Sequence, residues 1–133
     1  MNDCPFCHLD LIDNQKVVLE NENCMFIQVP QEILIGSGLI IPRAHRETVF
    51  ELTEQEWTAT KYLLKEAKDY IDKLYNPDGY NIGWNCNSIG GQHIMHAHLH
   101  IIPRYVDEPY AGKGIRHWLK SPENKRAQTK NID

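Results

Sequence analysis

The chain has 133 residues, of which 41% are hydrophobic and 24% charged, and its formal net charge is −4. This length suits one domain with one sizeable core and is short for two. The acidic balance argues against a protein that coats a nucleic acid polymer, because such binding needs a broad basic surface facing the phosphates. A small phosphate ligand held by a few groups remains compatible with this net charge.

The first residues contain no basic head followed by an apolar run, and no apolar stretch approaches the length of a membrane span. We therefore expect a soluble, cytoplasmic protein with no membrane partner. Because the cytosol keeps thiols reduced, the four cysteines are expected to be free thiols or metal ligands and not disulfides.

The first motif is Cys4-Pro5-Phe6-Cys7. Two thiolates at this spacing can bind one tetrahedral zinc, but a complete site needs two further ligands from elsewhere in the chain. Two other interpretations stay open, a pair of ordinary buried thiols and a redox pair. The redox interpretation is disfavoured because no strand followed by a helix frames the motif.

The next forty residues predict three strands. Two β-prone runs, Lys16 to Glu20 and Cys24 to Val29, are separated by a short polar segment that is typical of a hairpin. A glycine-bearing turn then leads into a buried strand over Leu39 to Ile41, which ends at Pro42. His45 follows three residues later and by itself is typical of a loop histidine.

A long amphipathic helix is predicted next. Thr53 and Glu56 have the spacing of a capping box, in which each side chain accepts a hydrogen bond from the other residue's amide. Apolar residues recur at helical spacing to about Tyr75, and Asn76-Pro77-Asp78-Gly79 then ends the helix. We assign its apolar stripe to packing.

A further strand is predicted over Tyr80 to Asn85, followed by a polar, glycine-bearing loop over Cys86 to Gly91. Glycines let backbone amides approach a ligand, and short polar side chains add donors. By itself this is an ordinary hairpin loop. Its position next to a histidine-rich segment makes it a candidate anion site.

The most informative stretch is His96-Ala97-His98-Leu99-His100-Ile101-Ile102. Its strict alternation predicts a strand whose imidazoles project from one face while the apolar side chains enter a core. Successive imidazoles would lie about 6.5 to 7 Å apart, close enough for several to contact one small anion.

Three interpretations of these histidines follow. In the first, the histidines are solvent-exposed residues on an edge strand. In the second, they form a three-histidine metal centre. In the third, they form a nucleophilic site in which a neutral imidazole attacks phosphorus. The apolar neighbours and the adjoining glycine loop oppose the first. Neutral imidazole suits the third, since its ordinary pKa of about 6.5 leaves it mostly uncharged at pH 7.

Residues 106–133 are predicted to form a C-terminal extension of the domain that covers residues 1–105. Its first part is a surface extension or contributes to a pocket or a dimer surface, and from Ser121 we expect a loose tail. The candidates for phosphate or partner contacts are Lys113, Arg116 and His117, and Trp118 is a candidate cap.

The histidine run resembles the signature of the histidine triad (HIT) family, and Gly91-Gln92 precedes it as in that family. The paired cysteines, the strand ending at Pro42 with a histidine beyond it, and the central helix occur in the order typical of bacterial, zinc-containing Hint- and Fhit-like members. The resemblance covers residues 1 to about 105. It implies an α+β fold, a five-stranded antiparallel sheet with a long central helix packed on it, and a homodimer.

The resemblance also implies roles for individual residues. His98 would attack the α-phosphate of a nucleoside phosphoramidate or dinucleoside polyphosphate and form a covalent nucleotidyl-histidine intermediate. His100 would contact the phosphate and assist the leaving group, and Asn85 and Gln92 would bind phosphate oxygens or the bridging atom. A structural zinc would be bound by Cys4, Cys7, His45 and His96.

The chain departs from the family pattern at three places. His93 stands where a Ser or Thr often donates to phosphate, which makes His93 a candidate substrate contact. Gln28 is the nearest counterpart of the residue that often binds the ribose. Gly36-Ser37-Gly38 lacks the histidine that is usual at its middle position.

We therefore predict a nucleotide hydrolase or transferase with a purine nucleotide or dinucleotide substrate. The alternative is a nucleotide-binding adaptor or sensor with little turnover. His98 and His100 favour the enzyme, and His100 also argues against the phosphorylase branch of the wider superfamily, which has a Gln at the third triad position.

Overall fold

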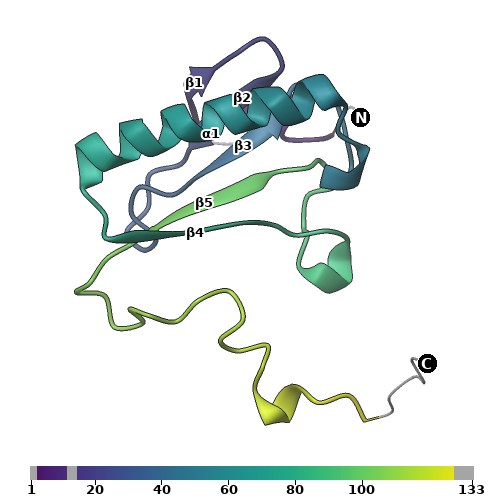
Figure 1. The fold of residues 1–133 in the computed structure, drawn as a ribbon. Helices are drawn as coiled ribbons and strands as arrows, with labels where there is room; N and C mark the ends of the chain where they lie inside the picture. Colours follow the sequence, from purple (N-terminus) through teal and green to yellow (C-terminus); the bar gives the residue numbers. More distant parts are fainter. Residues whose placement is uncertain (1–2, 12–14, 128–133) are drawn as a thin grey trace.

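A five-stranded antiparallel sheet lies at the centre of the computed structural model, which describes residues 3–11 and 15–127 (Figure 1). The strand order is β1-β2-β3-β5-β4, and a single long helix, α1 (Glu54–Tyr75), lies across one face. The strands are β1 (Lys16–Glu20), β2 (Cys24–Gln28), β3 (Gly38–Pro42), β4 (Gly79–Trp84) and β5 (Leu99–Arg104). The predicted fold class, sheet and helix are confirmed.

Four short 3-10 turns lie between or beyond these elements in the described part of the chain. They are η1 (Leu9–Leu11), η2 (Val49–Glu51), η3 (Ser88–Gly90) and η4 (Pro122–Asn124). Within the same residues, no helix is both long enough and apolar enough to cross a bilayer. The predicted loose tail falls partly on residues 128–133, which lie outside the described residues.

The capping box predicted at the start of α1 is present. The Thr53 side chain accepts a hydrogen bond from the Glu56 amide at 3.1 Å, and the Glu56 carboxylate accepts one from the Thr53 amide at 2.8 Å. At the other end Asn76 adopts a left-handed conformation, with φ of 49°, which ends the helix.

The sheet has a separate apolar cluster on each face. On the α1 side, side chains four residues apart on the helix, Leu63, Ala67 and Ile71, pack against Phe26 and Ile101. This spacing keeps them on one stripe of the helix. On the opposite face, the N-terminal segment packs through a second cluster of Cys4, Phe6, Met25, Ile27 and Ile41. The histidines of interest lie on this second face.

The histidine run differs from its prediction at its start. Strand β5 begins at Leu99, so His96 and His98 precede it in an irregular, buried segment. The β3–β5 pairing ends at Ile40 with Leu99, and the Ala97 amide donates to the Arg46 carbonyl at 2.6 Å. The chain therefore turns away from the sheet to meet the loop that carries His45, which alternation alone does not reveal.

Arg46 also links this loop to the start of α1. Its side-chain Nε donates to both carboxylate oxygens of Glu56, at 3.0 and 3.2 Å. Glu56 is only 3% exposed. Burial by itself raises the pKa of Glu56, but the hydrogen bonds and charge of Arg46 and the Thr53 donors outweigh it, so the pKa is lowered. The ion pair therefore supports the loop on which the histidine segment rests.

We predict that Glu56→Gln lowers the free energy of unfolding at pH 7 by about 1–3 kcal/mol, because buried donors lose a charged acceptor. Since the folded-state pKa is lowered, the stabilisation is present above the ordinary glutamate pKa of 4.5 and is lost as pH falls through the folded-state value. Urea unfolding across this range measures the change, with exposed Glu54→Gln as control. A wild-type advantage that persists unchanged in acid contradicts the prediction.

Candidate functional site

His98 and His100 lie beside each other on the sheet face opposite α1. His98 is 8% exposed and His100 is half-buried, and their ring centroids are 5.0 Å apart. Phe6, from the N-terminal segment, packs edge-on against His98 at 5.2 Å between centroids. Two imidazoles thus share one partly apolar site.

The protonation of His98 follows from one hydrogen bond. Its Nδ1 lies 2.8 Å from the backbone carbonyl of His96. A carbonyl only accepts, so Nδ1 carries the hydrogen and the lone pair of the neutral ring is on Nε2. Burial lowers the pKa of His98, which favours the neutral form. The side chain is therefore a neutral imidazole with a defined nucleophilic nitrogen.

His100 supplies a second polar atom at the same place. Its Nε2 is buried and has no hydrogen-bond partner among the described residues. Burial, and then the neighbouring His98, lower the pKa of His100. A buried polar atom without a partner costs free energy, and a ligand oxygen placed there would recover it.

The loop after β4 borders these histidines. Trp84 and Leu99 form the last pair of β4 and β5 at this end, and exposed Asn85 follows Trp84. The Asn85 amide lies against Gly91: a Cβ atom at Gly91 would stand 3.5 Å from its Nδ2. Gly91 has φ of 99°, a conformation that favours glycine. Asn85 therefore lies in the loop between β4 and the histidine segment, and its contact with a substrate stays a prediction.

Gln92 holds this loop from inside. Gln92 is only 1% exposed. Its Oε1 accepts a hydrogen bond from the Asn87 amide at 2.7 Å. Its Nε2 donates to the carbonyls of Glu47 and Ile94 at 2.6 and 3.0 Å. All its donors have protein partners. The amides of Gly90, Gly91 and Gln92 likewise donate within the loop, so these three are not free for an anion.

The other two candidate substrate contacts lie differently. His93 is exposed, and its charge contributes to lowering the pKa of His98, so the two side chains are within electrostatic range. Gln28 follows Phe26 on the α1 side of β2 and donates to the Gly36 carbonyl at 3.0 Å. The structure therefore places Gln28 on the sheet face opposite His100, and a substrate contact of His93 stays a prediction.

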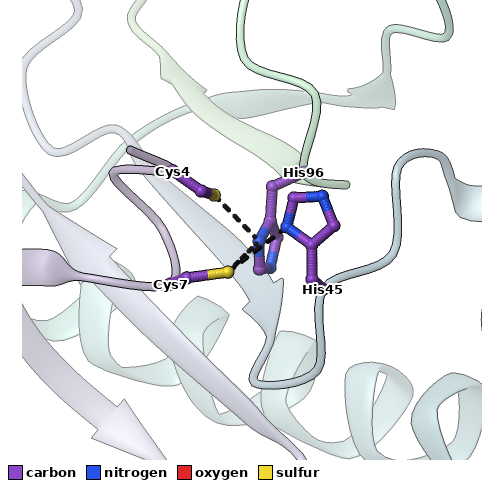
Figure 2. A group of neighbouring side chains, drawn as sticks. All are labelled: Cys4, Cys7, His45 and His96. Carbon is purple, nitrogen blue, oxygen red and sulfur yellow. Dashed lines mark hydrogen bonds between the residues drawn. The ribbon is translucent and has the colours of Figure 1, made fainter. Parts of the chain in front are cut away.

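The four residues named as zinc ligands lie together, as Figure 2 shows. Their ligating atoms are all within 4.8 Å of one another. The Cys4 and Cys7 Sγ atoms lie 3.4 and 3.5 Å from His96 Nδ1, and Cys7 Sγ lies 3.2 Å from His45 Nδ1. Bond lengths of about 2.3 Å to sulfur and 2.0 Å to nitrogen put these atoms about 3.5 Å apart around a tetrahedral zinc. The cluster fits a metal.

The orientation of His96 also suits a metal ligand. Its Nε2 lies 2.8 Å from the Pro42 carbonyl, so Nε2 carries the hydrogen and the lone pair on Nδ1 faces the two sulfurs. The His45 and His96 rings are perpendicular, with centroids 5.0 Å apart. His96 is fully buried, so the surrounding side chains restrict rotation of its ring.

Sequence reasoning missed Phe6 and Arg46. Phe6 packs against both His96 and His98, at 5.8 and 5.2 Å between centroids, and so contacts both the cysteine and histidine cluster and the candidate nucleophile. The position of Phe6 between the two cysteines of the motif was the sequence signal that could have identified it. Arg46 follows His45 directly, but its carbonyl accepts a hydrogen bond from the amide of Ala97, 51 positions along the chain, and this contact has no sequence signature.

Two adjacent histidines at the start of a sheet strand, next to a cluster of two cysteines and two histidines, define a recognisable class of protein. A family model described as the HIT domain matches residues 12–107. The chain therefore belongs to the HIT family.

Two relatives carry named activities. The adenylylsulfatase HINT3 of Arabidopsis thaliana is 32% identical over 122 residues, covering 90% of this chain and 62% of that protein. The adenosine 5′-monophosphoramidase hnt1 of Schizosaccharomyces pombe is 31% identical over 97 residues, covering 73% and 70%. Among solved structures, a HIT family protein from Bacillus anthracis superposes with a TM-score of 0.71 at 29% identity, covering 80% and 76%.

We predict that Gln92→Leu lowers the free energy of unfolding by about 1–3 kcal/mol, since it leaves the Glu47 and Ile94 carbonyls and the Asn87 amide without partners. Chemical denaturation measures this. Exposed Gln55→Leu is the matched control and should change stability by less than about 0.5 kcal/mol. Equal effects of the two substitutions would show that Gln92 does not hold the loop.

Proposed function

We propose that this protein is a nucleotide hydrolase or transferase that attacks the α-phosphate of a nucleoside phosphoramidate or dinucleoside polyphosphate through His98. The observation that carries the proposal is the His98 ring, whose Nδ1–H is bound to the His96 carbonyl and whose Nε2 is left as the nucleophile. The adenylylsulfatase and monophosphoramidase names of the two relatives support an adenylate derivative as substrate.

In the first step, the Nε2 lone pair of His98 forms a bond to the α-phosphorus while the bond from phosphorus to the leaving group breaks. The leaving group departs with that electron pair. An amine takes up a proton from solvent water, whereas a phosphate leaves as an anion and needs no proton. The His98 ring becomes cationic, which strengthens its hydrogen bond to the His96 carbonyl. His100 lies 5.0 Å away between centroids and is proposed to contact the phosphate and assist the leaving group.

In the second step, a water oxygen forms a bond to the same phosphorus and the bond from phosphorus to Nε2 breaks. The electron pair returns to Nε2, the water gives up a proton, and the nucleotide is released. Asn85 and His93 are the proposed phosphate contacts: Asn85 follows Trp84, which pairs with Leu99 next to His98, and the charge of His93 contributes to lowering the pKa of His98. For Gln92 the buried amide supports a positioning role, and Gln28 has no contact that supports a ribose role.

We further propose that Cys4, Cys7, His45 and His96 bind one structural zinc. Four protein ligands leave no open position, so a bound zinc would supply folding free energy and fixed geometry and no catalytic water. The chain's own residues would carry that rigidity to the nucleophile, because His96 offers its ring to the metal cluster and its carbonyl to His98.

The proposed setting is a cytoplasmic homodimer acting on a purine nucleotide or dinucleotide. Strand β4 lies at the edge of the sheet, and Ile82 on it is 39% exposed, which supports β4 as a pairing surface for a second copy. Part of the C-terminal extension is proposed to line the pocket in which the nucleotide would bind.

We predict that incubation with adenosine 5′-phosphoramidate yields a nucleotidyl adduct on the wild-type protein, seen by intact mass spectrometry after rapid acid quenching. His98→Asn should form no adduct and lose about 10³-fold or more in turnover, because an amide nitrogen has no comparable lone pair. Circular dichroism checks its fold. Wild-type protein that binds nucleotide but forms neither adduct nor product would support the adaptor alternative.

We also predict that protein purified without a histidine tag contains about one zinc per chain by elemental analysis. Cys7→Ser should weaken zinc binding at least about tenfold and lower the melting temperature, because it removes one thiolate ligand. Cys86→Ser, a half-buried thiol outside the cluster, is the control and should retain the metal. Zinc far below stoichiometry in the wild-type protein would refute the four-ligand site.

A further inference from the structure

A cavity of about 920 Å³ lies at the end of β5, beyond the histidine site. Its lining includes Ile102 and Arg104 of that strand but neither His98 nor His100. The other walls come from the loop before β3, the end of α1 and the C-terminal extension. This volume is within the range of small-molecule sites in proteins. The cavity is therefore a second candidate binding site, separate from the proposed chemistry of His98.

Arg104 fixes the wall that the extension supplies. Its guanidinium donates to the backbone carbonyls of Tyr110 and Lys113, both at 2.7 Å, and pairs with Glu108. The side chain of Arg104 is only 19% exposed. Because hydrogen bonds to a charged donor are stronger than neutral ones, they hold the backbone of the extension in a defined position beside β5.

The wall supplied by the loop before β3 contains a strained residue. Leu34 has φ of 55°, a left-handed conformation that costs free energy for a residue with a bulky side chain. The two following carbonyls are fixed by side chains from outside the loop. The Ile35 carbonyl accepts from the Tyr105 hydroxyl at 2.9 Å, and the Gly36 carbonyl accepts from Gln28 at 3.0 Å. Strain maintained in this way is typical of binding sites.

Large apolar side chains in the cavity lining are exposed to solvent. The exposed fractions are 48% for Leu34, 59% for Tyr110 and 65% for Trp118. Covering such surface with an apolar group is favourable, because it removes apolar area from water. The lining therefore suits a ligand that has an apolar body.

The charged groups of the cavity favour a cation. Arg104 and Glu108 pair with each other, which leaves two carboxylates, Glu32 and Asp107, against the single ammonium of Lys113. The ion pairs formed within residues 3–11 and 15–127 include none of these three side chains. The lining thus has one uncompensated negative charge, and a second is available to a ligand that displaces the Lys113 ammonium.

The position of Lys113 shows where the cationic group of a ligand would bind. Its ammonium lies 4.7 Å from the Tyr110 ring centroid and 5.3 Å from that of Trp118. Both distances are within the range of about 6 Å over which an aromatic ring attracts a cation. The two rings contact each other, with centroids 6.3 Å apart, and so form one aromatic seat. Since Lys113 has a flexible stem, its ammonium can leave this seat while its backbone stays bound to Arg104.

We propose that this cavity binds an organic cation, in which an ammonium group is attached to an apolar body. The cationic group lies at the Tyr110 and Trp118 rings, and the apolar body covers Leu34. The Lys113 ammonium occupies the same seat and competes with the ligand. Glu32 and Asp107 supply the compensating negative charge.

The test measures binding of three six-carbon probes to the full chain by isothermal titration calorimetry: hexyltrimethylammonium, 1-hexanol and hexanoate. We expect the cation to bind at least about threefold more tightly than the alcohol, and hexanoate to bind most weakly. Trp118→Ala should weaken binding of the cation roughly 3- to 10-fold, because half of the aromatic seat is lost. Lys113→Met should strengthen it at least about twofold, because the competing ammonium is removed.

The matched controls lie on α1, outside the cavity. Trp57→Ala removes another half-exposed tryptophan and Lys65→Met another exposed lysine, and both should bind the cation within twofold of wild type. Thermal unfolding confirms that each variant is folded. The probes contain no phosphorus, so their binding is measured independently of turnover at His98.

Three results would overturn the proposal. The first is a cation that binds no more tightly than the alcohol, and the second is an affinity for the cation that stays unchanged in Trp118→Ala or falls in Lys113→Met. The third is absence of binding by any probe together with a shift from dimer to monomer in Trp118→Ala, measured by sedimentation. That result would assign the exposed lining to contact with a second copy of the chain.

Discussion

The hydrogen bond from His98 Nδ1 to the His96 carbonyl is the constraint on which the proposed chemistry depends. It determines which nitrogen of a neutral imidazole carries the lone pair, and it does so with a backbone atom whose position follows from the fold. His96 has its ring in the cysteine and histidine cluster and its carbonyl at the nucleophile. One residue therefore joins the proposed metal site to the proposed nucleophile.

The segment that carries His96 and His98 is held by contacts from distant parts of the chain. The Pro42 carbonyl orients the His96 ring, and the Arg46 carbonyl accepts from the Ala97 amide. Arg46 is in turn paired with Glu56 at the start of α1. The helix therefore does more than cover the sheet, because its first turn supports the loop against which the histidine segment rests. A segment that left the sheet without these partners would have unpaired buried amides.

The sheet face opposite α1 is covered from two ends of the chain. The N-terminal segment packs through Phe6 over β2 and β3, and the extension held by Arg104 lies along β4 and β5. Phe6 packs against His98, and Ile115 lies near Gly83, which pairs with His100.

Much of this was readable from local patterns. Capping residues, hydrophobic periods and turn residues are local, and they predicted α1 and five strands to within a few residues. The paired cysteines and the first histidine of the alternating run lie in one cluster with His45, as predicted. The strand expected to begin at His96 begins at Leu99, because alternation does not show where a ladder of hydrogen bonds ends.

What the sequence by itself determined was the identity of the chemical groups: two thiols, a set of alternating imidazoles, a glycine-bearing loop and a basic extension. Only the tertiary structure decided which groups meet. It assembled Cys4, Cys7, His45 and His96 from three separate segments, turned the Gln92 amide inward and placed Gln28 on the far side of the sheet. The physical reason is that these relations depend on long-range hydrogen bonds and on which face of a strand a side chain occupies, and neither leaves a local sequence pattern.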